Sequence, residues 1–202
     1  MNKTQIIKGI KHPIKAFVYI KKLCRGFYYR VIFKFTGKRV SIGKNFMVKG
    51  RLSIKGPGTV AIGNNVFIDG TSHAVTPWTY SKEAIISIGD NVFLNGTRFG
   101  CRMTIEIGNN CILADCRILD VDHHSVIPSR RNDQKAIKSA PIKIGNNVWI
   151  SMDCAILKGV KIGDNTTITA KSVVMNNVPA NCICGGNPAN IIRVLSKEEL
   201  VE

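Results

Sequence analysis

A four-residue pattern, Ile-Gly followed by Asn, Asp or Lys and then Asn, constrains the fold of this 202-residue chain more than any other feature. It begins at six positions, which are Ile42, Ile62, Ile88, Ile107, Ile144 and Ile162. Aliphatic residues also recur every six positions, most regularly in the series Ile144, Ile150, Ile156, Ile162, Ile168 and Val174. The residues four positions further on are small or β-branched, namely Val148, Cys154, Val160, Thr166 and Ser172. A short repeat of this kind indicates a solenoid.

A six-residue period fits neither an α-helix nor an alternating strand, but it fits a short strand followed by a tight turn. The aliphatic residue would point inward, and Gly-Asn or Asp-Asn would supply left-handed backbone at the corners. Three units make a triangular coil of about 18 residues, as between Ile144 and Ile162. Stacked coils pair their strands in parallel around an aliphatic column. We therefore predict a parallel β-helix, with a β-sandwich of regular turns as the alternative.

These repeats resemble those of the hexapeptide-repeat acyltransferases over roughly residues 40–195. The resemblance implies an all-β fold, a left-handed parallel β-helix occupying residues 41–195. We expect a basic amphipathic helical segment at 1–40 and a short C-terminal helix at 196–202, begun by a capping box of Ser196 and Glu199. Because the family also contains binding and structural solenoids, a non-catalytic solenoid stays open as an alternative.

The six-residue rhythm is lost across residues 125–141, which predicts a loop extruded from a corner of the helix. Just before it stands Asp120-Val-Asp122-His123-His124-Ser125, which matches an Asp-x-Asp-x-His pattern of the family. The resemblance implies that His124 is the general base and that Asp120 or Asp122 fixes its tautomer. An imidazole titrates near neutral pH and can take a proton from an attacking hydroxyl. The alternative is that the histidine pair is only a solvated loop feature.

A second interruption of the rhythm contains Ser72 and His73, for which the sequence suggests no role. Asn95 matches an Asn that helps to hold acceptor or thioester in sugar acetyltransferases, and its amide could donate a hydrogen bond to an oxyanion. The alternative is an ordinary corner Asn.

The resemblance also implies residues that bind acetyl-CoA. Trp149 and Ser151 match a stretch that lines the acyl-CoA groove, with Ser151 in place of the usual Gly. Ala170 and Lys171 lie one coil further on the same edge, where they could meet pantetheine and phosphate. Arg193, in the closing signature, suits a phosphate, although Asn190 stands where many relatives carry Lys. Ordinary coil packing is the alternative for each.

The seven cysteines form no CxxC pair and no zinc-binding spacing. We expect reduced thiols that fill small positions in the core of a cytoplasmic protein. No metal is expected: a zinc-dependent β-helix hydratase of the carbonic anhydrase type needs three His ligands, and two contiguous histidines without a third at coil spacing fit it poorly.

The charge of the chain is concentrated in its N-terminal third. Lys and Arg number 29 against 13 acidic residues, and Asp69 is the first carboxylate in the sequence. Residues 1–40 have the spacing of an amphipathic helix, with Pro13 kinking or restarting it. One face holds Ile6, Ile10, Ile14 and Phe17, and the other holds Lys8, Lys11, Lys15 and Lys22. This pattern is typical of a helix at an anionic membrane surface. The alternative is a cap on the β-helix, and nucleic-acid binding lacks a groove-reading motif.

The resemblance implies an acetyl-CoA-dependent O-acetyltransferase acting on a sugar hydroxyl, and the basic N-terminus favours a role in cell-surface polysaccharide (O-antigen or capsule) biosynthesis. The resemblance implies a homotrimer with its active sites between subunits. A lipid-linked saccharide at the inner face of the membrane is the expected acceptor, with the protein cytoplasmic or peripheral there. N-acetylation of a nucleotide-linked amino sugar and O-acetylation of an antibiotic are the alternatives.

Overall fold

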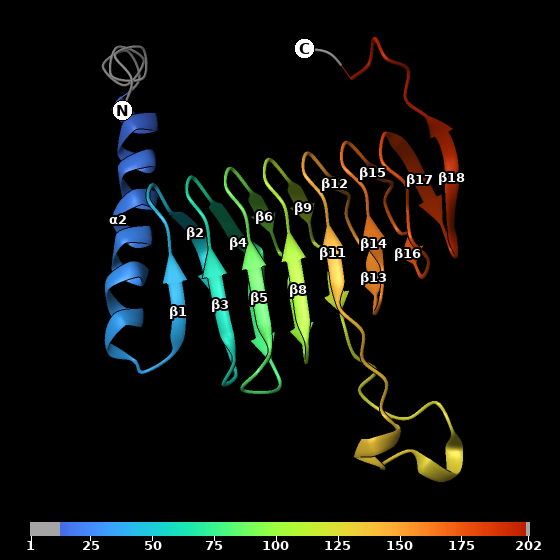
Figure 1. Cartoon of the computed structure of the whole chain (residues 1–202). Helices are drawn as coiled ribbons and strands as arrows, with labels where there is room; N and C mark the ends of the chain where they lie inside the picture. The colour runs from blue at the N-terminus through green and yellow to red at the C-terminus, as the bar shows by residue number, and fades with distance from the viewer. Residues whose placement is uncertain (1–12, 201–202) are drawn as a thin grey trace.

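The computed structural model describes residues 13–200 as an α-helix followed by a three-sided prism of stacked coils (Figure 1). The helix, α2, spans Pro13–Phe35. Face A of the prism contains β1 (Arg39–Ile42), β3 (Thr59–Ile62), β5 (Ile85–Ile88), β8 (Thr104–Ile107), β11 (Ile142–Ile144) and β14 (Lys161–Ile162). Face B contains β2 (Met47–Leu52), the first part of β4 (Phe67–Thr79), β6 (Phe93–Asn95), β9 (Ile112–Ala114), β12 (Trp149–Ile150), β15 (Thr167–Ile168), β17 (Cys182–Gly186) and β18 (Ala189–Val194). Face C contains the last part of β4, β7 (Arg98–Cys101), β10 (Arg117–Leu119), β13 (Ala155–Leu157) and β16 (Val173–Val174).

Neighbouring strands pair in parallel on all three faces, and only β17 and β18 pair antiparallel among the described strands. The long strand β4 turns from one face to the next, because Phe67–Asp69 pair with β6 and Thr76–Thr79 pair with β7. The fold is a left-handed parallel β-helix, as predicted, and this pairing excludes the β-sandwich.

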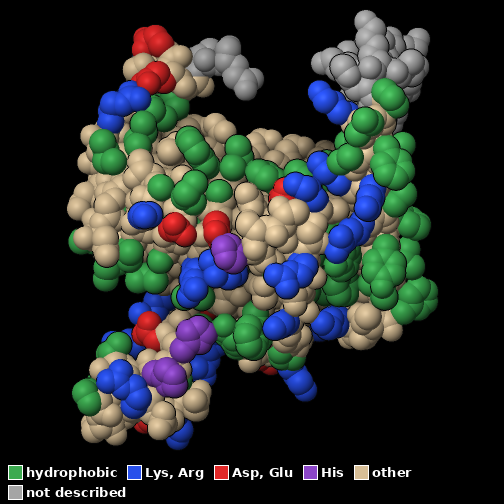
Figure 2. Space-filling view, turned by 180° about the vertical axis from the view of Figure 1, so that it is seen from behind, with side chains coloured by type: hydrophobic (Ala, Val, Ile, Leu, Met, Phe, Trp, Pro, Cys, Tyr) green, Lys and Arg blue, Asp and Glu red, His purple; other side chains and the backbone are tan. Residues whose placement is uncertain are grey.

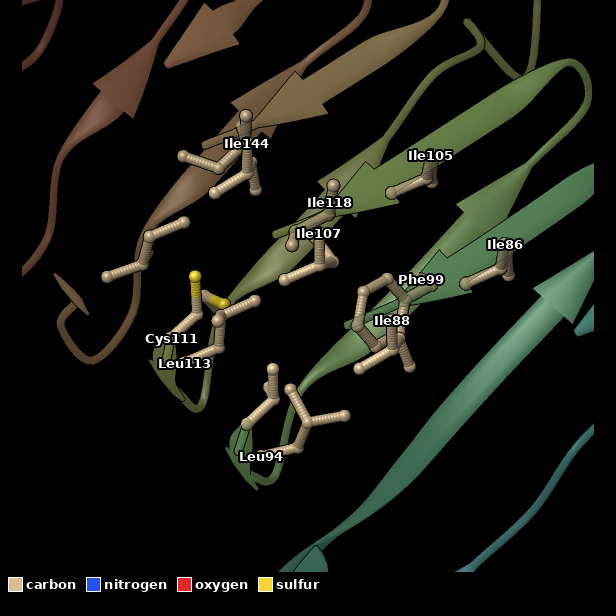
Figure 3. Packing of buried hydrophobic residues seen from close by; sticks show 14 of the residues in the cluster. Ile86, Ile88, Leu94, Phe99, Ile105, Ile107, Cys111, Leu113, Ile118 and Ile144 are labelled. Atoms are coloured by element: carbon tan, nitrogen blue, oxygen red, sulfur yellow. The ribbon is translucent and has the colours of Figure 1, made fainter. Parts of the chain in front are cut away.

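The aliphatic column lies inside the prism. Every member of the series from Ile144 to Val174 is at most 3% exposed, and Figure 3 shows Leu94, Phe99 and Ile107 pointing inward from the three faces. Six cysteines are buried and free, as expected, whereas Cys24 is exposed on α2. Burial raises the pKa of Cys116 to about 12, so this thiol stays protonated and serves as packing.

The fourth residue of each repeat turns the corner between faces A and B with a left-handed backbone, as predicted. All six of these Asn residues have φ between 52° and 58°, a region that Asn tolerates better than most residues. Their amides form a ladder between coils, for example from Asn45 to Asn65 at 2.9 Å and from Asn65 to Asn91 at 3.0 Å. A Cβ on the preceding Gly63 would lie 2.6 Å from the backbone of Gly89, so the repeat needs glycine there.

Helix α2 begins at Pro13, as Pro at the first helical position favours, and it closes the open end of the prism beside β1 and β2 (Figure 1). Phe33 is buried, and the ring of Tyr29 stacks on it with centroids 5.9 Å apart. The capping role that the sequence left open is therefore present. Residues 1–12, which include Ile6 and Ile10 of the predicted apolar face, lie outside the described residues.

Gly26 sets the distance between α2 and the first coil, because a Cβ at this position would lie 1.7 Å from the carbonyl oxygen of Phe46. We expect Gly26→Ala to lower the free energy of unfolding by about 1–2 kcal/mol, since overpacking against backbone exceeds the gain in helix propensity. Urea unfolding measures the change. Cys24→Ala, on the exposed side of the same helix, is the control and should leave the midpoint unchanged; an unchanged midpoint for Gly26→Ala would show that the cap is not tightly packed.

The predicted C-terminal helix is wrong for the described residues, where 196–200 form a turn. The backbone N–H of Ser196 donates to Glu199 at 2.9 Å, as in a capping box, but five residues give too few hydrogen bonds to offset helix nucleation. Residues 201–202 lie outside the described part of the chain.

Candidate active site

The segment between β10 and β11 leaves the prism at edge CA, the edge where each coil passes from face C to face A (Figure 1). Its base is a short stem, in which the N–H of Asp122 donates to the carbonyl of Lys138 at 2.9 Å and that of Ala140 to Asp120 at 2.9 Å. Further out it forms two turns of 3₁₀ helix, Pro128–Arg130 and Gln134–Ala136. The stem fixes the direction in which the loop leaves the prism, so the two histidines next to it are held by backbone rather than by a free chain.

The structure separates the environments of His123 and His124. His123 stands edge-on to the ring of Tyr80, with centroids 5.3 Å apart, and it lines a pocket of about 310 Å³ together with Ser81, Arg102 and Asp122. His124 is exposed and does not line this pocket. Both residues lie in a bend of the chain, and only the ring of His123 faces this wall.

The structure gives both predicted carboxylates hydrogen-bond partners other than a histidine, and their tautomer-fixing role stays a prediction. Asp120 is fully buried and accepts the backbone N–H groups of Arg102 and Met103, both at 2.7 Å. Asp122 accepts the Nζ of Lys158 at 2.7 Å. Asp120 therefore holds the turn between β7 and β8, and Asp122 ties the loop stem to the next coil.

A second polar cluster, which the sequence did not assign, lies at edge BC, where each coil passes from face B to face C. His73 Nδ1 lies 3.0 Å from Asp115 Oδ2, and Arg98 donates to the other oxygen of this carboxylate at 3.1 Å. Asn95 lies beside them: the N–H of Asp115 donates to its carbonyl, and its side-chain Oδ1 is buried without a partner in the described chain. The only signal in the sequence was the interruption of the repeat around His73.

The predicted donor-binding residues lie along edge BC and face B in the later coils. Ser151 is half-buried just after β12, and exposed Ala170 and Lys171 occupy the same corner one coil on, where the N–H of Lys171 donates to Met152 at 2.9 Å. Trp149 is 50% exposed on face B. These residues share one side of the prism with Asn95 and its cluster.

Trp149 and Arg193 lie in one row across face B, because Trp149 pairs with Thr167, Thr167 with Ile183, and Ile183 with Arg193. Three strand spacings separate them by about 14 Å. Arg193 is paired with Glu199 through two hydrogen bonds of 2.6 and 2.8 Å. These hydrogen bonds lower the pKa of Glu199 to about 2 and raise the pKa of Arg193. Glu199 also lines a pocket of about 230 Å³ against Trp149, so the C-terminal turn covers part of this face.

The structure does not bring all the candidate residues together within one chain. His124 follows β10 at edge CA, whereas Asn95 and the donor-binding residues lie along edge BC or face B, with face C between them. The strand Arg98–Cys101 crosses this face and alone spans about 10 Å. Figure 2 shows histidines on the body of the prism and on the projecting loop below it.

Among residues 13–200, no three His, Cys, Asp or Glu side chains are grouped to hold a metal ion.

Residues 141–176 match the family of bacterial transferase hexapeptide proteins (six repeats). The chain is 38% identical over 96 residues to a galactoside O-acetyltransferase of Escherichia coli, which covers 48% of this chain and 47% of that protein. It is 35% identical over 89 residues to a putative colanic acid biosynthesis acetyltransferase of the same species, covering 44% and 47%. The chain thus spans about half the length of the curated relatives it matches. These matches confirm the resemblance to hexapeptide-repeat acetyltransferases.

Solved structures share the fold. AntD, an N-acyltransferase from Bacillus cereus in complex with dTDP and 3-hydroxybutyryl-CoA, superposes with a TM-score of 0.69 at 22% identity, covering 84% of this chain and 90% of that one. A hexapeptide-repeat acetyltransferase from Vibrio cholerae superposes with a TM-score of 0.53 at 27% identity, covering 77% and 73%. A galactoside acetyltransferase in complex with coenzyme A gives 0.56 at 23% identity, covering 91% and 86%.

Proposed function

We propose that this hexapeptide-repeat β-helix transfers an acetyl group from acetyl-CoA to a sugar hydroxyl, in the assembly of a cell-surface polysaccharide. The observation that carries the proposal is the pair of exposed histidines held at the base of the extruded loop. His123 lines a pocket with Tyr80, Ser81 and Arg102, and His124 follows it outside that pocket. Support also comes from the relatives, one of which is a galactoside O-acetyltransferase and another a putative colanic acid biosynthesis acetyltransferase.

In the proposed reaction, the imidazole of His124 takes the proton of the acceptor hydroxyl as its oxygen attacks the thioester carbonyl. A carbon–oxygen bond forms, the carbon–sulfur bond breaks, and the proton passes from the imidazolium to the departing thiolate of coenzyme A. The amide of Asn95 would donate a hydrogen bond to the oxyanion, a role for which neutral amides suffice. The proposal gives no cysteine the role of nucleophile, because six of the seven are buried in the prism and Cys24 lies on the distant cap.

The proposed site is shared between copies of the chain. His124 and Asn95 border opposite edges of face C, too far apart to act on one substrate within a single prism. A cyclic homotrimer would place edge CA of one copy against edge BC of the next. The cluster of His73, Arg98 and Asp115 would then face the base across the cleft, beside the thioester donor.

Arg193 is proposed to bind a phosphate of coenzyme A, and Glu199 competes for it. We expect Glu199→Gln to lower the Kd for coenzyme A severalfold, because the guanidinium is released for phosphate. The pair is complete above the ordinary pKa of Glu and is lost only as the pH falls through about 2, so the gain should be equal at pH 5 and pH 8. Titration calorimetry measures it; Glu198→Gln is the control, and an unchanged Kd for Glu199→Gln would remove Arg193 from the donor site.

Mass spectrometry of products from isotopically labelled acetyl-CoA tests the function directly. A thiol-reactive dye that detects released coenzyme A would also react with the exposed Cys24 of the protein. Direct detection of the acetylated product avoids this background. The acceptors to compare are galactosides, lipid-linked saccharides, a nucleotide-linked amino sugar and antibiotics that carry a free hydroxyl group. Transfer to a saccharide hydroxyl supports the proposal. Preference for the amino sugar or an antibiotic would redirect it, and absence of coenzyme A binding would favour a non-catalytic solenoid.

A further inference from the structure

Helix α2 carries an apolar stripe on the side that faces away from the prism. Its members recur at helical spacing and are all exposed: Phe17 (68%), Ile20 (53%), Phe27 (64%), Val31 (39%) and Phe35 (81%). The opposite side holds Gly26 and Phe33, which are buried against the first coil. The stripe therefore does not take part in capping the prism. A contiguous exposed apolar surface of this kind is typical of a site that binds a membrane or another protein.

Basic side chains flank the stripe on both sides. Lys21 and Arg25 lie along one border and Arg30 and Lys34 along the other, as the helical spacing requires. No acidic residue occurs in α2, or anywhere in the chain before Asp69. In Figure 2, apolar side chains line the outer rim of the helix and basic ones lie between that rim and the prism.

We propose that this stripe, formed by Phe17, Ile20, Phe27, Val31 and Phe35, docks the protein on an anionic lipid bilayer. Apolar and aromatic side chains would enter the boundary between headgroups and acyl chains, and the flanking bases would meet anionic headgroups. A second copy of the chain is the less suitable occupant, because two such helices would bring like charges together. The helix lies on the bilayer rather than across it: among residues 13–200, no helix has the length and hydropathy to cross.

The geometry also sets the orientation. Helix α2 lies across the first coil at the end of the stack, so its outer face looks along the axis of the prism (Figure 1). Docking would stand the prism upright on the membrane, with the extruded loop and edge CA on its flank. In a cyclic trimer the three stripes would lie in one plane, and their binding would be multivalent. Docking itself does not depend on the proposed reaction, and its test uses no substrate.

Cys24 allows the proposal to be tested on the full native chain. It lies on the outer side of α2, and the other six cysteines are buried, so an environment-sensitive fluorophore attaches to this thiol. We expect blue-shifted emission with vesicles of phosphatidylcholine and phosphatidylglycerol, and little change with phosphatidylcholine alone. Raising the salt from about 0.05 to about 0.5 M should weaken binding, because the Debye length shrinks severalfold.

Sedimentation with the same vesicles compares unlabelled variants. Phe17→Ser combined with Phe27→Ser should weaken binding at least about tenfold, since two aromatic rings no longer enter the bilayer. Ile192→Ser, at a residue 64% exposed on β18, is the matched control and should bind as the parent does. Equal binding by the double variant, or no binding by the parent, would overturn the proposal. A change in the solution mass of the double variant without vesicles would show that the stripe covers another copy instead.

Discussion

Replacing His124 with Ala is expected to lower kcat/KM for acetyl transfer by about 10²- to 10⁴-fold, the range that a positioned general base contributes. The ring is exposed on a loop whose stem is fixed by backbone hydrogen bonds, so its loss should not change the fold. The KM for acetyl-CoA should change little, because the donor-binding residues lie on another edge of the prism. Steady-state rates from mass spectrometry, with a thermal melt of each variant, measure both effects.

His123→Ala is the matched control for this experiment, one residue away on the same stem. His123 packs against Tyr80 and lines the pocket, so its loss should raise KM for the acceptor more than it lowers kcat. A larger loss of kcat for His123→Ala than for His124→Ala would move the base to His123. Activity that survives both changes would reject histidine as the base altogether.

The fold was predictable because each coil repeats the same physical requirement. An inward aliphatic residue, a small residue at one corner and a left-handed Asn at another recur so often that one misread repeat does not matter. The C-terminal turn shows the limit of local signals. Ser196 and Glu199 make the predicted contact, but Glu199 also binds Arg193 on β18 and the segment stays a turn.

The candidate site was less predictable, because the sequence pattern names residues without saying what each one contacts. Asp120 and Asp122 stand in the expected motif, yet Asp120 accepts hydrogen bonds from two backbone amides and Asp122 accepts one from Lys158. His73 and Asp115 are 42 residues apart in sequence, and only the stacking of coils brings them together. Long-range contacts of this kind depend on the register between coils, which a single break in the repeat can shift.

Mixing two inactive variants is expected to restore activity if the site is shared between copies. His124→Ala and Asn95→Ala should each be nearly inactive, the second by about 10²- to 10³-fold if its amide stabilises the oxyanion. In a randomly mixed cyclic oligomer, about a quarter of the sites would combine an intact His124 from one copy with an intact Asn95 from the next. Co-expression of the two chains in equal amounts, purification of the unselected mixture through a tag that both carry, and rate measurement test this.

The double variant His124→Ala/Asn95→Ala, mixed equally with the parent chain, is the control for this experiment. If each site draws on two copies, about a quarter of the sites are intact, whereas about half are intact if each chain holds its own site. Face C separates His124 and Asn95 by the length of a strand, so we expect about a quarter of the sites to be intact. No recovery in the mixed single variants, with half the activity in the control, would show that one prism contains the whole site. The loop from Asp120 to Pro141 would then have to fold back across face C during the reaction.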